Sequence, residues 1–158
     1  MGSSHSPLLI VAVALVLFAA ATGSAIGVVA IPDPTPAALG TGDVTLSVVS
    51  EPDGAQLRAD RYTDVYQLHV PPVILDVEAL SGAPTVTASL DLDRLGYTRS
   101  SVFTLRSTGR KEIQVQPTTL DADRIRNDSY SGRLRLVLRS DAGDQLLVNR
   151  SIRIEVVE

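Results

Sequence analysis

The sequence predicts an all-β domain, an antiparallel sandwich of about seven to eight strands, preceded by one N-terminal transmembrane or signal helix. Two patterns lead to this prediction. Residues 7–31 are uncharged and apolar, whereas residues 43–158 alternate apolar and polar side chains with turn signals at regular spacing. Aromatic residues make up only 4% of the chain. We therefore expect a core of Val, Leu and Ile, which pack well on a pleated sheet.

The apolar segment follows a short tail, residues 1–6. At helical rise, Pro7–Ile31 would measure about 37 Å, enough to cross a hydrocarbon core of about 30 Å. We favour an uncleaved single-pass anchor, because the run is longer than an ordinary signal-peptide core and no Lys or Arg precedes it. The alternative is a signal peptide cleaved after Ala25 or Ala30, which would release a secreted domain.

A proline-rich linker, residues 32–42, is expected between this segment and the domain. Prolines at 32, 34 and 36 favour an extended polyproline II spacer. The first downstream arginine, Arg58, is too distant to set the orientation of a membrane helix by flanking charge. We expect the C-terminal domain on the extracytoplasmic side, because the spacer and two glycosylation sequons suit that location.

The domain, residues 43–158, begins with four predicted strands. Turn or breaker residues follow the first, second and third of them: Glu51–Gly54, Pro71-Pro72 and Ser81–Pro84. The four strands are 43–50, 64–70, 73–80 and 85–92. The side chains expected on their inner faces are Val44, Leu46, Val48, Tyr66, Leu68, Val70, Val73, Leu75, Val77, Val86, Ala88, Leu90 and Leu92.

Four more strands complete the prediction. The turn Ser107–Arg110 separates two short ones, and Asp141–Asp144 joins the last two as a hairpin. Their ranges are 101–106, 112–116, 130–140 and 146–157. In the last pair we expect Leu134, Leu136, Leu138, Ile152, Ile154 and Val156 to face inward.

The segment Leu120–Leu136 resembles the E–F corner of immunoglobulin-like (Ig-like) domains, with Asp128 two residues before Tyr130. The hairpin that follows is similar to the F–G hairpin of bacterial and archaeal surface modules. The chain thus broadly resembles membrane-anchored extracytoplasmic Ig-like β-sandwich surface proteins of bacteria and archaea. The resemblance implies a structural role for Tyr130, whose hydroxyl would bond to upstream backbone. The chain lacks the cysteines and the Trp of antibody-type domains, so only the broad fold carries over. The alternative is an ordinary Tyr that begins an ordinary strand.

Both asparagines of the chain lie in acceptor sequons, Asn127-Asp-Ser129 and Asn149-Arg-Ser151. An attached oligosaccharide is bulky and hydrated, so an acceptor must lie on accessible surface. We predict Asn127 in a loop and Asn149 on the outward face of a strand. Both are candidate glycosylation sites.

Arginines recur along the last two predicted strands. If they share one face, they form a basic stripe that suits acidic glycans or a partner protein. The alternative is a soluble surface on which Arg lies opposite Asp or Glu of neighbouring strands. The five candidates are Arg133, Arg135, Arg139, Arg150 and Arg153.

Composition argues against several functional classes. The chain has no cysteine, which removes disulfides and thiolate chemistry, and its net charge of −4 argues against nucleic-acid binding. His69, the only histidine outside the tail, is expected to be an ordinary sheet residue, and no hydrolase, metalloprotease or phosphate-binding motif occurs. We expect no enzyme activity, no metal, no cofactor and no small-molecule substrate. The single lysine, Lys111, and the acidic surface hint at a high-GC, haloarchaeal or actinobacterial source.

The sequence therefore predicts a membrane-anchored extracytoplasmic β-sandwich with a structural or protein-interaction role in the cell envelope. Its expected partners are the membrane, through residues 7–31, and other envelope proteins or further copies of itself. A rival is a surface-filament subunit, similar in layout to archaeal pilins and archaellum stators, although no processing motif precedes the apolar segment. Another is a secreted binding module.

Overall fold

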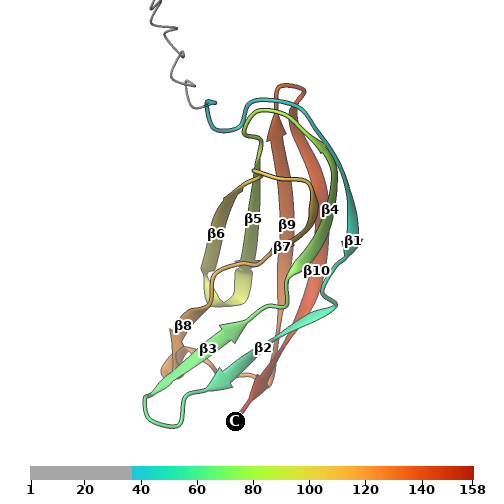
Figure 1. Ribbon diagram of the computed structural model, residues 1–158. Coiled ribbons are helices and arrows are strands. Elements are labelled where there is room, and N and C mark those ends of the chain that lie inside the picture. Colours follow the sequence, from blue (N-terminus) through green and yellow to red (C-terminus); the bar gives the residue numbers. More distant parts are fainter. Residues whose placement is uncertain (1–36) are drawn as a thin grey trace, which may run out of the picture. The chain divides into compact units, whose positions relative to one another are not determined.

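Ten strands form the domain in the computed structural model, which describes residues 37–158 (Figure 1). Two short 3₁₀ helices, Asp93–Leu95 and Ala122–Arg124, interrupt them. The strands are β1 (Val44–Ser50), β2 (Gly54–Ala59), β3 (Val65–His69), β4 (Val73–Leu80), β5 (Thr85–Leu92), β6 (Tyr97–Thr104), β7 (Gly109–Ile113), β8 (Thr118–Asp121), β9 (Ser129–Ser140) and β10 (Gly143–Val157).

The strands form two sheets. One has three strands in the order β1-β4-β7, and the other has seven in the order β6-β5-β9-β10-β2-β3-β8. All neighbours are antiparallel except β2 and β10, which run parallel from the pair Gly54–Arg153 to the pair Arg58–Val157. The first half of β10 pairs only with β9, and its second half pairs with both β9 and β2.

The alternating side chains of the central strands form the hydrophobic core. The predicted inner faces of β4, β5 and β9 are confirmed. Leu75, Leu90 and Leu136 are each 0% exposed. At an average of about 25 cal/mol per Å² of apolar area, complete burial of one Leu side chain contributes about 1.5–3 kcal/mol. Val44, Leu46 and Val48 of β1 face the same core but are only partly buried.

Gly132 of β9 lies on the inner face, where the core is closely packed. A Cβ at this position would lie 2.7 Å from Leu92 Cδ2 and 3.0 Å from Ile154 Cδ1. Nearby, the two ends of the seven-stranded sheet approach each other. Arg124, after β8, donates a hydrogen bond to the carbonyl of Leu95, before β6. The sheet therefore curls around this part of the core.

Hydrogen bonds fix the chain where it joins the domain. Gly40 N–H donates to the Ala83 carbonyl (2.8 Å), and Ala83 N–H donates back to Thr41 (2.7 Å). Asp141 N–H, in the β9–β10 turn, donates to the Gly42 carbonyl. We call residues 40–43 and these partners the N-terminal clamp. It lies at the end of the domain opposite the C-terminus (Figure 1).

The structure confirms the all-β class and adds two strands to the eight predicted from sequence. β2 and β8 fall in stretches without a predicted strand, and residues 40–42 of the predicted linker bond to the domain. The predicted tail, membrane segment and first linker residues, 1–36, lie outside the described residues. Within residues 37–158, no helix is long and apolar enough to cross a membrane.

Candidate interaction surface

Tyr130 begins the inner face of β9 and is 5% exposed. Its hydroxyl oxygen accepts hydrogen bonds from the backbone N–H groups of Arg126 (2.8 Å) and Asn127 (3.1 Å). Asp128 contributes its backbone carbonyl, which accepts from Val156 N–H of β10. Tyr130 thus fixes the loop before β9 through two hydrogen bonds to its backbone.

Four of the five candidate arginines lie on the outer face of β9 and β10. Arg133, Arg135 and Arg139 alternate with the buried leucines of β9, and Arg153 pairs in register with Ser131. Three of the four have an acidic partner within ion-pair distance: Arg135 with Asp91 at 2.7 Å, Arg139 with Asp144 at 2.8 Å, and Arg153 with Glu155 at 3.9 Å.

These pairs compensate much of the positive charge on the outer face. Exposed pairs of this kind contribute little to stability, because water and salt screen the attraction between the two charges. The hydrogen bond from Arg135 lowers the pKa of Asp91, helped by a second one from Thr98. The hydrogen bond from Arg139 likewise lowers the pKa of Asp144. The outer face is thus a mixed-charge surface rather than a purely basic one.

Arg150 does not belong to this outer face. It pairs in register with the buried Leu134, so it shares the parity of Ile152 and points to the inner side. There its guanidinium bonds to Asp53 and lies 3.6 Å from Glu51, both in the β1–β2 turn. Period-two alternation from Ile152 would have revealed this difference.

Both sequon asparagines are exposed. Asn127 lies between the second 3₁₀ helix and β9, with its backbone held by Tyr130. Asn149 lies on β10 opposite Arg135, on the outer face. Both positions meet the accessibility that an oligosaccharide requires, and their modification stays a prediction.

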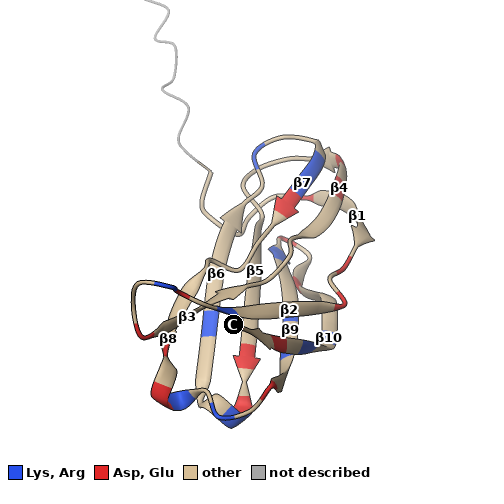
Figure 2. Ribbon diagram, turned by 90° about the horizontal axis from the view of Figure 1, so that it is seen from below, with Lys and Arg blue, Asp and Glu red and all other residues tan. Residues whose placement is uncertain are grey.

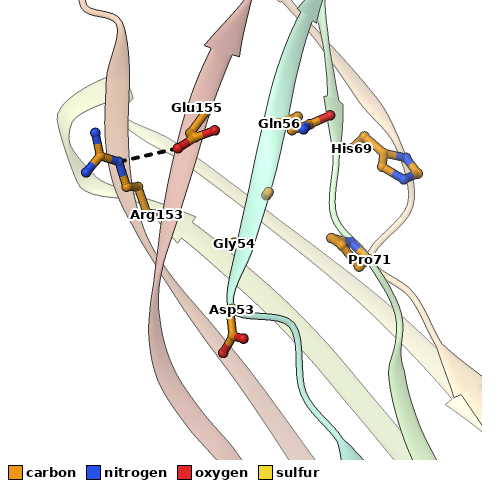
Figure 3. A pocket seen from close by; sticks show the side chains of 8 residues that line it. Asp53, Gly54, Gln56, His69, Pro71, Arg153 and Glu155 are labelled. Atoms are coloured by element: carbon orange, nitrogen blue, oxygen red, sulfur yellow. Dashed lines mark ion pairs between the residues drawn. The ribbon is translucent and has the colours of Figure 1, made fainter.

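A shallow groove of about 460 Å³ crosses the outer surface of β10, β2 and β3. Figure 3 shows Arg153 and Glu155 on one side and His69 and Pro71 on the other. Glu155, Gln56 and His69 form one row, because Gln56 is in register with both of the others. His69 ends β3 with its side chain exposed, as expected of a sheet residue.

The groove was not predicted from the sequence. Gly54 forms part of its floor, where a Cβ would lie 2.9 Å from the Arg153 carbonyl oxygen. The only sign of the groove in the sequence is Gly54, at the start of a strand that was not predicted. The groove depends on the parallel β2–β10 pairing, which brings together residues about one hundred positions apart.

No family model matches this chain, and no curated protein matches it either.

Proposed function

We propose that this protein is a membrane-anchored extracytoplasmic β-sandwich with a structural or protein-interaction role in the cell envelope. The membrane part of the proposal rests on the uncharged segment Pro7–Ile31 and the proline-rich spacer after it. The domain would be held outside the membrane, where Asn127 and Asn149 are accessible for glycosylation.

The observation that carries the proposal is the N-terminal clamp. Gly40 and Thr41 bond to Ala83, and Gly42 bonds to Asp141, at the end of the domain farthest from the C-terminus (Figure 1). A domain fixed at one end presents both sheets and the far end to partners. This arrangement suits a surface component, because the chain enters the domain at one end and leaves the opposite end free for partners.

We further assign the domain to the Ig-like fold. In this assignment β1, β4 and β7 correspond to strands A, B and E, and β5, β6, β9 and β10 correspond to C, C′, F and G. The hydrogen bonds of Tyr130 support it, since a corner Tyr at the start of strand F makes bonds of this kind. The β2–β3 hairpin and β8 extend the second sheet beyond that pattern.

Labelling of intact cells tests the location. The chain has no cysteine, so the exposed Thr108, in the β6–β7 turn, serves as the position of a single label. In cells expressing full-length Thr108→Cys, a membrane-impermeant maleimide should label the protein before lysis. Equal expression with labelling only after lysis would contradict an extracytoplasmic domain. The unsubstituted chain is the matched control.

Intact mass tests the anchor. An uncleaved anchor predicts a mature protein that retains the residues before Ile26 and resists extraction from membranes by alkaline carbonate. A mature chain that begins at Ile26 or Ile31 would favour the secreted alternative. In a glycosylating host, excess mass that disappears in Asn127→Gln or Asn149→Gln would identify the modified asparagine.

A further inference from the structure

The domain has several open strand edges. Three of them, those of β7, β8 and the open half of β10, are protected against pairing with another strand by their own residues. Charged residues lie on β7 (Arg110, Lys111 and Glu112) and on the open half of β10 (Asp144 and Arg150). β10 is also bulged between Leu146 and Val148. β8 has only four residues and ends at Asp121. Charges, bulges and short length are the usual means of blocking edge-to-edge pairing.

The edge of β6 is covered by the chain itself. Arg99 of β6 donates to the Gln116 side chain at 3.1 Å, and Gln116 N–H donates to Ser101 Oγ at 3.2 Å. The segment between β7 and β8 therefore runs beside this strand. A further strand would have to displace it.

β1 differs from all of these edges. Its sequence, VTLSVVS, contains no charge and no proline. Figure 2 shows it without acidic or basic colour, on the opposite side of β4 from the charged β7. Only β4 pairs with it in the described part of the chain. The β1–β4 register shifts twice: β4 has an extra residue, Glu78, between the partners of Thr45 and Leu46, and β1 bulges at Val49. On β1 itself the five residues Val44–Val48 follow one another without a bulge and have an unpaired edge.

The side chains of Val44–Val48 indicate what kind of strand could pair with this edge. Val44, Leu46 and Val48 face the core but stay partly buried, whereas Thr45 and Ser47 are exposed on the outer face. An added strand would complete the burial of the apolar row. The occupant must present an uncharged apolar row of the same spacing, because a charged strand would leave unpaired charge against it.

We propose that β1 pairs with β1 of a second copy of this chain, antiparallel and about a two-fold axis at Leu46. In this register Val44 lies opposite Val48 of the other copy, and Thr45 lies opposite Ser47. The row of the first copy then meets an identical row, so the contact is self-complementary and closed. The two three-stranded sheets become one continuous sheet of six. This pairing gives the proposed interaction role a partner, and it deepens that proposal.

Disulfide cross-linking of the full-length chain in detergent micelles tests the register. Residues directly opposite in an antiparallel pair have Cα atoms about 4.5–5.5 Å apart, within disulfide range. A mixture of Thr45→Cys and Ser47→Cys proteins, carrying different tags, should therefore give a mixed-tag dimer under mild oxidation. Either variant alone places its sulfurs diagonally, and it should give little dimer.

Two controls distinguish specific pairing of the β1 strands from disulfides formed by random collision between copies. Thr108→Cys lies in the exposed β6–β7 turn, separated from β1 by β4, and should remain monomeric under the same oxidation. Leu46→Lys, introduced into both the Thr45→Cys and the Ser47→Cys proteins, places two like charges directly opposite each other at the two-fold axis. It should reduce the mixed-tag dimer by about tenfold. Circular dichroism must show that every variant keeps its β structure.

Three results would overturn the proposal. These are dimer yields no higher than that of Thr108→Cys, equal cross-linking by Thr45→Cys alone, and preferential cross-linking of Thr45→Cys to Lys111→Cys. The last result would join unlike edges, β1 to β7, and build an open filament instead of a closed pair. Membrane labelling is a separate measurement, so failure of the pairing leaves the proposed location independently tested.

Discussion

Arg135 of β9 donates a hydrogen bond to Asp91 of β5 at 2.7 Å, across the outer face of the seven-stranded sheet. The Asp91 side chain is 18% exposed. Its pKa is lowered below the ordinary value of 3.8, chiefly by this bond. The pair links β5 to β9, which are neighbours in the sheet. It adds to stability only while Asp91 is ionised, because the attraction to Arg135 requires the negative charge.

We expect this pair to affect acid stability. Because the pKa of Asp91 is lower in the folded state, its contribution is fully present above the ordinary Asp value and disappears as pH falls through the folded pKa. Asp91→Asn should thus destabilise the protein at neutral pH and flatten the loss of stability on acidification. Urea unfolding at a series of pH values measures this effect. Asp141→Asn removes a carboxylate from the exposed β9–β10 turn and is the matched control.

Tyr130→Phe should destabilise the domain by about 1–3 kcal/mol. The substitution keeps the buried ring but removes the hydroxyl, so the N–H groups of Arg126 and Asn127 lose their acceptor. Chemical denaturation measures the difference. Tyr62→Phe removes the same atom from a side chain that is 95% exposed and should leave stability unchanged. Equal effects of the two substitutions would contradict a structural role for the Tyr130 hydroxyl.

Gly132→Ala should cost about 1–3 kcal/mol because the added methyl overpacks the core. The new Cβ would lie 2.7 Å from Leu92 Cδ2. Leu92→Val shortens the contacting side chain and should partly rescue Gly132→Ala. A double-mutant cycle by thermal unfolding measures the coupling. Strict additivity of the two substitutions would show that the contact is not the cause.

Two glycines with similar backbone geometry separate steric contact from backbone strain. Gly42 has φ +97° and Gly143 has φ +99°. A Cβ on Gly42 would lie 2.1 Å from the Ser81 carbonyl oxygen, whereas nothing lies within 4 Å of one on Gly143. Gly143→Ala should cost about 1–2 kcal/mol from the left-handed conformation alone. Gly42→Ala should cost clearly more, and melting temperatures of the two variants give the comparison.

Period-two alternation was sufficient to predict most of the core. In Val73–Leu80 and Thr85–Leu92, the alternating positions of the apolar residues predict which side chains are buried. The structure gives these two strands the same bounds as the prediction. β2 was missed because Gly54–Ala59 holds only two buried apolar side chains, Ala55 and Leu57, directly after a turn. β8 has a single buried residue, Leu120. Segments this short form strands only because they pair with neighbouring strands.

Long-range pairing limited the prediction of the surfaces. Exposure of the two sequons and alternation along β9 followed from local patterns. The groove required the parallel pairing of β2 with β10, and the open edge of β1 required the complete strand order. No turn signal between adjacent segments encodes either relationship, because both depend on residues far apart in the chain.

The parallel pairing of β2 and β10 has a mechanical consequence. The chain joins the domain at one end, through the N-terminal clamp, and leaves it at the other after β10 (Figure 1). Tension between these ends pulls β2 and β10 in opposite directions along their length. The interstrand hydrogen bonds from the Gly54–Arg153 pair onward are then loaded together in shear, rather than peeled apart one at a time. The domain should therefore resist stretching strongly for its size, and single-molecule pulling from Ala37 and Glu158 would measure the force.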